Sequence, residues 1–271
     1  MDPLNIASAR QDATALQENL LLLCRELSTH TAGWEYHDEG GVVWRMSPLP
    51  LVAFNSVQRT RLRPDQADAH IRRLHGWFKI RGKRMGWFIW SVDEPEDLSG
   101  RLLAHGFTAH SFLPALSLAI ADAPLDEGGP AGLVFSRVRD EGDFDDYETA
   151  CIHGMGWDDN AAGMLAFLEA YRRAGYADGG PIRHYLGRRN GRAVATGTLV
   201  VGGEAAGLYA ISTAPEERHQ GIGRAMTIHL LREAAAAGSA TAVLQSSPMG
   251  FWMYKGLGFQ TCGEIAVYIG P

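Results

Sequence analysis

The chain has 271 residues, 46% of them hydrophobic, which is enough for two domains with separate cores. Its 31 acidic residues outnumber its 25 basic ones, and the net charge of −6 argues against binding to the phosphate backbone of nucleic acid. The cysteines Cys24, Cys151 and Cys262 are widely separated, which argues against a disulfide framework and a zinc site. The apolar run at residues 20–24 is too short for a signal peptide or a membrane span, so we expect a cytoplasmic protein that binds no membrane.

The first half contains two helix–strand pairs. A helical stretch at residues 64–82 is followed by an apolar strand at 85–90, and a second helix at 94–106 is followed by a strand at 112–120. Residues 121–132, "ADAPLDEGGPAG", then combine prolines, glycines and acids without apolar periodicity. This composition predicts a linker and therefore two domains, residues 1–126 and 127–271.

The second half alternates between strands and helices. In chain order the pattern predicts a strand at 132–138, helices at 144–153 and 162–174, and strands at 183–189, 192–201 and 206–213. A helix at 221–237, a strand at 241–246, a short helix at 249–257 and a strand at 264–270 follow. The fold class is α/β (α+β), a mixed, mostly antiparallel sheet flanked by helices.

The two halves end in the same order of features. In each half, a helix that ends at a glycine is followed by a strand that ends in serine. A second helix and a Gly-Phe pair come next, Gly106-Phe107 in the first half and Gly258-Phe259 in the second. This order predicts a tandem duplication with a divergent first copy.

A glycine-rich turn precedes the helix at 221–237. The first backbone N–H groups of a helix have no partner inside it and carry a partial positive charge, so a turn that lets them approach a phosphate forms an anion site. With Gly221 and Gly223 at the turn, the amides of His219, Gln220, Gly221, Ile222, Gly223 and Arg224 could surround a pyrophosphate, and Arg218 and Arg224 would add positive charge.

Two other interpretations compete for this turn. The glycines could simply form a tight strand-to-helix connection. A dinucleotide-binding turn would need a third glycine where the chain has Met226, and an acid after the next strand, which ends in Gln245-Ser246.

Together with "YKGLGF", the stretch "ISTAPEERHQGIGRAM" resembles the acetyl-CoA-binding core of the GNAT N-acetyltransferase superfamily. The resemblance implies two tandem GNAT-like domains, of which the second holds acetyl-CoA between splayed strands. It implies that Ile211, Ser212 and Thr213 hold the acetyl carbonyl and the pantetheine arm, and that the glycine turn holds the pyrophosphate.

The resemblance also suggests a catalytic residue. Tyr254 matches the family's tyrosine, which protonates the departing thiolate, and a phenol with a pKa near ~10 stays protonated at neutral pH. The alternative is that Tyr254 only packs a short helix. Ser247 occupies the position of a cofactor-contacting asparagine, although a serine before proline is also a good helix cap.

The acceptor side is less defined. His153 could be a base, Asp158 and Asp159 could attract a cationic amine, and Trp157 and Tyr209 could line a pocket, but each residue type also has ordinary structural roles. The strand at 206–213 lacks the glutamate that serves as base in many relatives, so the base stays open. In the first copy the turn has no glycine, and Leu102 stands where the second copy has Tyr254.

The resemblance implies an acetyl-CoA-dependent N-acetyltransferase in which a primary amine attacks the thioester directly in a ternary complex. A small molecule is favoured as the acceptor, and an amino group of a protein is the other option. The alternative is a non-catalytic protein that senses CoA or acyl-CoA.

Overall fold

The computed structural model describes residues 3–158, 161–175, 179–203 and 205–271. These residues divide into two compact units. Unit 1 contains the chain up to Ala115 together with Cys262–Pro271, and unit 2 is Leu116–Thr261.

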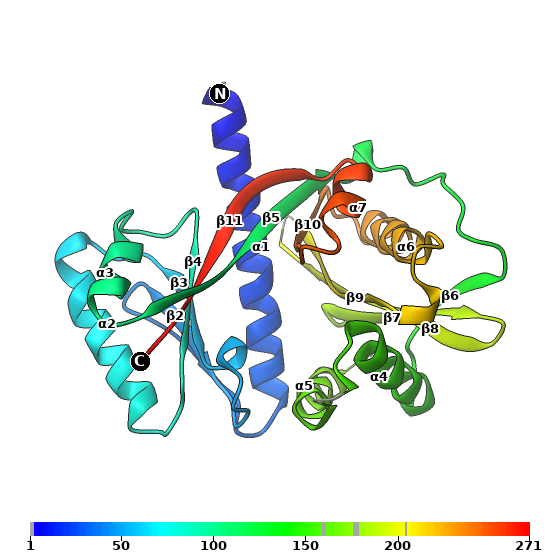
Figure 1. Cartoon of the computed structure of the whole chain (residues 1–271). Coiled ribbons are helices and arrows are strands. Elements are labelled where there is room, and N and C mark those ends of the chain that lie inside the picture. Colours follow the sequence, from blue (N-terminus) through cyan, green and yellow to red (C-terminus); the bar gives the residue numbers. More distant parts are fainter. Residues whose placement is uncertain (1–2, 159–160, 176–178, 204) are drawn as a thin grey trace. The chain divides into compact units, whose positions relative to one another are not determined.

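Unit 1 combines helices with a mixed sheet (Figure 1). In chain order it contains α1 (Pro3–His30), β1 (Glu35–Glu39), β2 (Val42–Met46), β3 (Ser56–Thr60), α2 (Pro64–Lys79), β4 (Gly86–Trp90), α3 (Leu98–Ala104), the first part of β5 (Thr108–Ala119) and most of β11 (Gln260–Ile269). The strand order is β1-β2-β3-β4-β11-β5. β3 and β4 are parallel, whereas the β1–β2, β2–β3 and β4–β11 pairs are antiparallel.

Large side chains fill the core of unit 1. Trp44 from β2, Trp87 from β4 and Phe78 from α2 are almost completely buried, and Leu74 on the same helix lies one turn from Phe78. The apolar residues of α2 recur at positions 67, 71, 74 and 78, which gives the helix one continuous face toward the sheet.

Unit 2 contains the end of β5 and a second sheet region with the order β5-β10-β9-β8-β7-β6. Its elements are β6 (Leu133–Arg137), α4 (Glu141–Met155), α5 (Ala161–Ala174), β7 (Ile182–Arg189), β8 (Arg192–Gly202), β9 (Ala205–Thr213), α6 (Ile222–Ala236), β10 (Thr241–Gln245) and α7 (Phe251–Gly256). The pairs from β6 to β9 are antiparallel, and β9 and β10 are parallel.

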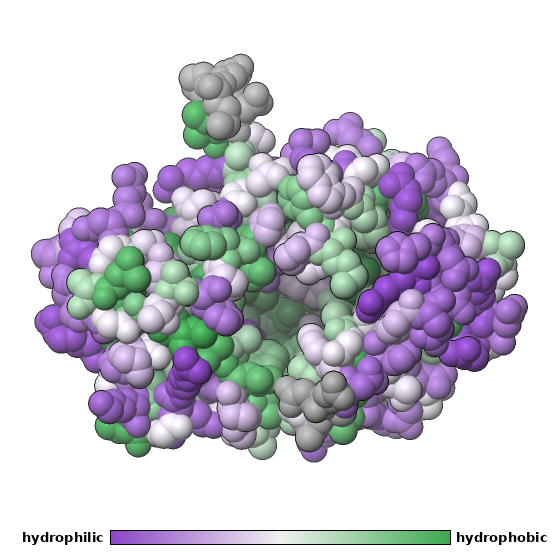
Figure 2. Space-filling view, in the orientation of Figure 1, coloured by the Kyte–Doolittle hydropathy of each residue, from purple (hydrophilic) through white to green (hydrophobic). Residues whose placement is uncertain are grey.

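Helices cover both faces of the unit 2 sheet. Figure 1 shows α6 on one face, with α4 and α5 on the other. Glycines let α6 pack closely, because a Cβ at Gly197 would lie 2.8 Å from Leu230 Cδ1 and 3.1 Å from Met226 Sδ. The surface over β6, β7 and β8 is mainly hydrophilic (Figure 2).

The predicted mixed, mostly antiparallel sheet flanked by helices is confirmed, and the helices and strands expected after residue 63 are all present within a few residues. Helix α1 and strands β1, β2 and β3 were not predicted from the sequence. The compact units also divide the chain differently from the expected boundary between residues 126 and 127, since β5 and β11 each contribute residues to both units.

The two units share the succession of features expected from a tandem arrangement. In each half of the chain, a parallel strand pair joined through a helix is followed by a short helix and a long strand, β5 or β11, which contributes to both units. The Gly-Phe pairs coincide in detail, because Phe107 N donates to Leu102 O at 3.0 Å and Phe259 N donates to Tyr254 O at 3.1 Å. The preceding glycines, Gly106 and Gly258, both have positive φ.

Candidate functional site

The parallel strands of unit 2 separate before they end. β10 pairs with β9 only from Thr241 opposite Ala205 to Val243 opposite Gly207, although β9 continues to Thr213. On the side that faces β10, the backbone N–H and C=O groups in the second half of β9 are therefore not part of the β9–β10 ladder. Backbone groups on such a strand edge can bind a ligand.

A bulge interrupts β9 within this separated half. Thr196 of β8 faces Ser212 and Thr198 faces Tyr209, so Ala210 and Ile211 have only Gly197 opposite them. Ala210 has φ 47°, a left-handed conformation that costs a non-glycine residue about 1–2 kcal/mol. The bulge breaks the regular alternation of peptide groups where the predicted acyl-binding residues Ile211, Ser212 and Thr213 lie.

Helix α4 and strand β8 hold the bulge in place. The Thr196 hydroxyl donates to Ala210 O at 2.9 Å and lies 2.7 Å from the Ser212 hydroxyl, with Thr196 fully buried and Ser212 5% exposed. A Cβ at Gly154 of α4 would lie 2.8 Å from Ser212 Cβ, closer still to its Oγ, and 3.2 Å from Thr213 N. Only glycine at position 154 lets α4 approach β9 this closely.

The turn between β9 and α6 contains two residues in the left-handed conformation. A short 3-10 helix (Pro215–Glu217) leads to His219 and Gly221, with φ values of 61° and 79°, and Gly221 is the N-cap of α6. As a glycine, this N-cap has no side chain that could cap the helix. The buried Ile222 anchors its first turn in the core, while His219, Gln220 and Gly221 are exposed.

The two glycines keep the space in front of the turn open. A Cβ at Gly221 would meet only Pro130, at 3.8 Å, and one at Gly223 would lie 3.4 Å from Thr213 Oγ1 and 3.5 Å from Met253 Sδ. The turn, the end of β9 and helix α7 therefore meet at Gly223.

The arginines beside the turn already have protein partners. Arg218 donates to Gly154 O at 3.0 Å and to Thr213 O at 3.3 Å, so it joins α4 to the end of β9. Arg224 binds the Glu127 carboxylate through two hydrogen bonds of 2.8 and 2.9 Å and also donates to Gly256 O at 3.1 Å. A phosphate at either arginine would share a guanidinium that the fold already uses.

Gln220 is also engaged. Its Oε1 accepts a 2.5 Å hydrogen bond from Arg189, and its Nε2 lies 3.4 Å from Glu217 Oε2. These contacts tie the turn to β7.

Tyr254 lies in α7, the helix that packs against this turn. Its side chain is 8% exposed, and its ring meets Phe259 at 5.7 Å in an edge arrangement. Burial raises the pKa of the phenol, so the hydroxyl keeps its proton at neutral pH. Among the hydrogen bonds of the described residues, none involves this hydroxyl.

Ser247 has the structural role that the sequence allowed as an alternative. Its Oγ accepts from Gly250 N at 3.2 Å, and its carbonyl accepts from Gly250 N and Phe251 N at 3.2 Å. Ser247 therefore stabilises the start of α7, while its exposed side chain stays within reach of solvent.

Of the candidates for the acceptor side, the structure brings His153 and Asp158 together. His153 lies 3.0 Å from Glu216 Oε2 and 3.5 Å from Asp158 Oδ2. The Glu216 contact raises the pKa of His153, so less of the imidazole is in the neutral form that could accept a proton at neutral pH. Trp157 and Tyr209 are half-buried. Asp159 lies outside the described residues.

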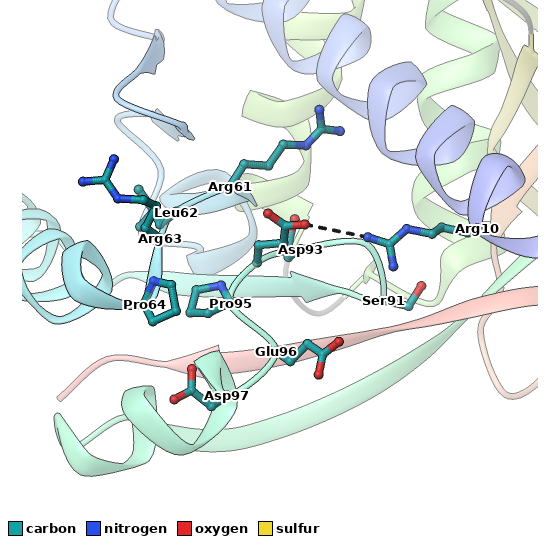
Figure 3. Close-up of a pocket in the computed structure, with 11 residues that line it drawn as sticks. Arg10, Arg61, Leu62, Arg63, Pro64, Ser91, Asp93, Pro95, Glu96 and Asp97 are labelled. Atoms are coloured by element: carbon teal, nitrogen blue, oxygen red, sulfur yellow. Dashed lines mark ion pairs between the residues drawn. The ribbon is translucent and has the colours of Figure 1, made fainter. Parts of the chain in front are cut away.

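Unit 1 has a cavity beyond the ends of its parallel strands, β3 and β4, which correspond to β9 and β10 of unit 2. It has a volume of about 650 Å³, and in Figure 3 Arg61 and Arg63 lie on one side, Glu96 and Asp97 on the other, and Asp93 between them. The sequence has no glycine turn before α2, and this helix begins directly at Pro64.

Asp93 occupies the gap between the ends of β3 and β4. Its Oδ1 accepts from Thr60 N at 3.2 Å and from Gln17 Nε2 at 2.9 Å, and its Oδ2 accepts from Trp90 N at 3.1 Å. The carboxylate therefore uses backbone donors at the ends of both strands. In unit 1 the Asp93 side chain thus lies in the gap between the ends of its parallel strands. In unit 2 the corresponding gap lies between β9 and β10.

Three residues near the site were not identified from the sequence. Thr196 bonds the bulge, Gly154 admits α4, and Glu127 binds Arg224. Of the three, only Thr196 could have been noticed in the sequence, because it is a polar residue in the apolar run "RAVATGTLVV". The roles of Gly154 and Glu127 depend on contacts between distant parts of the chain.

Comparison with known proteins agrees with this geometry. Residues 84–259 match the model of the acetyltransferase (GNAT) family. A GCN5-related N-acetyltransferase from Kribbella flavida superposes with a TM-score of 0.70 at 17% identity, over 97% of this chain and 95% of its own. Among curated proteins there is no match.

Two further solved structures share the fold. A GCN5-related N-acetyltransferase from Sphaerobacter thermophilus has a TM-score of 0.63 at 13% identity, over 86% of this chain and 81% of its own. A tandem GNAT protein from the clavulanic acid biosynthesis pathway has a TM-score of 0.61 at 11% identity, over 89% and 85%. The family match covers well over half of the chain, and the protein belongs to the acetyltransferase (GNAT) family.

Proposed function

We propose that this protein is an acetyl-CoA-dependent N-acetyltransferase that transfers the acetyl group directly to a primary amine of a small molecule in a ternary complex. The observation that carries the proposal is the meeting at Gly223 of three features of unit 2: the separated end of β9, the uncapped start of α6, and α7 with Tyr254. A transferase needs all three parts, for the thioester, the pyrophosphate and the leaving thiolate.

The residues at the site fit acetyl-CoA. The left-handed Gly221 and the open space before it leave room for a pyrophosphate on the amides of residues 219–224. When bound, the thioester supplies an activated acetyl group. Backbone groups of Ile211, Ser212 and Thr213 would hold its carbonyl and the pantetheine arm, and they would stabilise negative charge on the carbonyl oxygen as the amine attacks.

Tyr254 is proposed as the general acid. As the C–N bond forms and the C–S bond breaks, the phenol gives its proton to the thiolate, and the attacking amine loses a proton to a base or to water. His153 is disfavoured as that base because its contact with Glu216 raises its pKa. A water molecule is the proposed proton acceptor.

The acceptor and the location are also part of the proposal. None of the described helices has the length and apolar content needed to cross a bilayer. Cys24, Cys151 and Cys262 are buried and free, which suits the reducing cytoplasm. We propose a small amine as acceptor, and neither nucleic acid nor a membrane as partner.

A non-catalytic CoA or acyl-CoA sensor is the second candidate. The ion pair between Arg224 and Glu127 and the lack of a carboxylate on β9 favour it, because they reduce the charge available for phosphate and for catalysis. The test is thiol release from acetyl-CoA in the presence of a panel of primary amines. Transfer to an amine supports the enzyme, whereas binding without transfer to any of them supports the sensor.

Binding is tested separately with acetyl-CoA, CoA and NADH. Acetyl-CoA is expected to raise the melting temperature, because a ligand of the folded state stabilises it by mass action, and NADH is expected to leave it unchanged. Stabilisation by NADH alone would contradict the family's cofactor for this chain.

Replacement of Tyr254 by phenylalanine tests the acid. Tyr254→Phe keeps the buried ring but removes the proton, so turnover should fall by roughly 10²–10⁴ while the affinity for CoA changes little. Unchanged turnover across the pH range would return Tyr254 to a packing role.

A further inference from the structure

We propose that Thr196 is a positioning residue of the acyl site: its hydroxyl holds the β9 bulge at Ala210 in the shape that receives the thioester carbonyl. This inference rests on the proposed function and adds a residue to it. Thr196 lies on β8, outside the glycine turn and outside the tyrosine helix, and it matches no part of the motif that identified the family.

The hydrogen bonds of Thr196 are directional. A threonine hydroxyl has one proton, and Thr196 donates it to Ala210 O at 2.9 Å. In the 2.7 Å contact with Ser212, Thr196 is therefore the acceptor and Ser212 the donor. One hydroxyl thus bridges the backbone at the start of the bulge and the side chain just after it.

This bridge acts on a conformation that the chain does not prefer. Ala210 has a positive φ, which favours glycine, and Ala210 and Ile211 together face only Gly197. Without the Thr196 hydroxyl, the backbone at Ala210 would lose this hydrogen bond and would relax toward a less strained conformation. The backbone groups of Ile211 and Ser212 would then turn away from the positions that they have in the bulge.

Thr196 differs from a neighbouring buried threonine in the groups that its hydroxyl contacts. Thr196 is completely buried, and Gly154 of α4 packs closely against Ser212. Thr198, two residues along the same strand, is equally buried but bonds Tyr147 Oη at 2.6 Å and His184 Nδ1 at 2.9 Å. Thr198 therefore provides a matched control with the same side chain and burial but no bond to the bulge.

The experiment compares three variants of the full chain. Thr196→Val keeps the shape and removes the hydroxyl, Thr196→Ser keeps the hydroxyl, and Thr198→Val removes an equivalent hydroxyl elsewhere. Affinities for acetyl-CoA and for CoA are measured by calorimetry, because only acetyl-CoA has the acyl carbonyl. Melting temperature reports the structural cost.

We expect Thr196→Val to weaken acetyl-CoA binding roughly tenfold relative to CoA binding and to lower turnover with the best amine of the panel by roughly 10- to 100-fold. Thr196→Ser should restore both values. Thr198→Val should lower the melting temperature while leaving the ratio of the two affinities unchanged.

The outcomes separate the two proposals. If wild-type protein binds neither ligand, the proposed function fails and the role of Thr196 with it. If the wild-type protein binds both and Thr196→Val shows the same affinity ratio and turnover as Thr198→Val, only the role of Thr196 is overturned.

Discussion

Asp93 allows a quantitative test of the structure of unit 1. Its carboxylate is 7% exposed, and burial raises its pKa from 3.8 to about 6, against the lowering effect of hydrogen bonds from Gln17 and the amides of Trp90 and Thr60. One pKa unit corresponds to ~1.36 kcal/mol, so ionised Asp93 costs the folded state about 3 kcal/mol relative to the unfolded chain.

The direction of the pH effect follows from this raised pKa. Between pH 3.8 and about 6 the folded state binds a proton that the unfolded state releases, so the unfolding free energy falls as the pH rises through this window. Above about pH 6 the contribution no longer changes. Asp93→Asn cannot ionise and should lose this dependence, while its amide oxygen can still accept from Thr60 and Gln17.

The assay is urea unfolding of the wild type and of Asp93→Asn at several pH values, followed by tryptophan fluorescence. Five of the seven tryptophans lie in unit 1, so the signal reports mainly on this unit. Between about pH 4.5 and 7.5, the wild type should lose about 2 kcal/mol relative to the variant. Asp97→Asn is the control, because hydrogen bonding to Arg101 lowers the pKa of Asp97. A constant difference between wild type and Asp93→Asn would refute the reasoning.

Three further substitutions test unit 2. Gly154→Ala places a Cβ 2.8 Å from Ser212 Cβ and should cost ~1–3 kcal/mol by urea unfolding and weaken acetyl-CoA binding; an unchanged stability would contradict the close packing. Gly221→Val forces a branched side chain into a left-handed conformation and should weaken CoA binding in calorimetry, and an equal dissociation constant would argue against the turn as the phosphate site. The raised pKa of His153 means that its pair with Glu216 stabilises the fold at low pH and is lost as the pH rises through the folded pKa. In melting curves His153→Gln should therefore approach the wild type at high pH, and a gap that widens with pH would contradict this.

The sequence was most informative where one local conformation decides the structure. Gly221 adopts a positive φ before α6, and the residues that anchor this helix follow it directly in the chain. The turn could therefore be predicted from a short stretch of sequence. The Gly-Phe pairs were informative for the same reason, because Phe107 and Phe259 each close a hydrogen bond to a residue only five positions earlier.

Contacts between distant residues could not be predicted in this way. The alternating pattern of residues 264–270 indicates a strand but not its neighbour, and β11 pairs with β4 of unit 1 rather than completing the sheet of its own half. The linker composition predicted a loop, yet nothing in it indicated that Glu127 binds Arg224 or that Arg232 donates to Leu125 O at 2.7 Å. Such pairs depend on the fold as a whole.

The placement of β11 has a consequence for synthesis in the cell. The ribosome releases the chain up to Ala115 well before Cys262–Pro271, and at 5–20 residues per second the intervening stretch takes roughly 7–30 s to translate. During this time the nascent unit 1 lacks the strand that lies between β4 and β5, and both of these strands have an unpaired edge. The first unit to leave the ribosome is thus the last to become complete, and over that interval its open edges are exposed to chaperones and to neighbouring nascent chains.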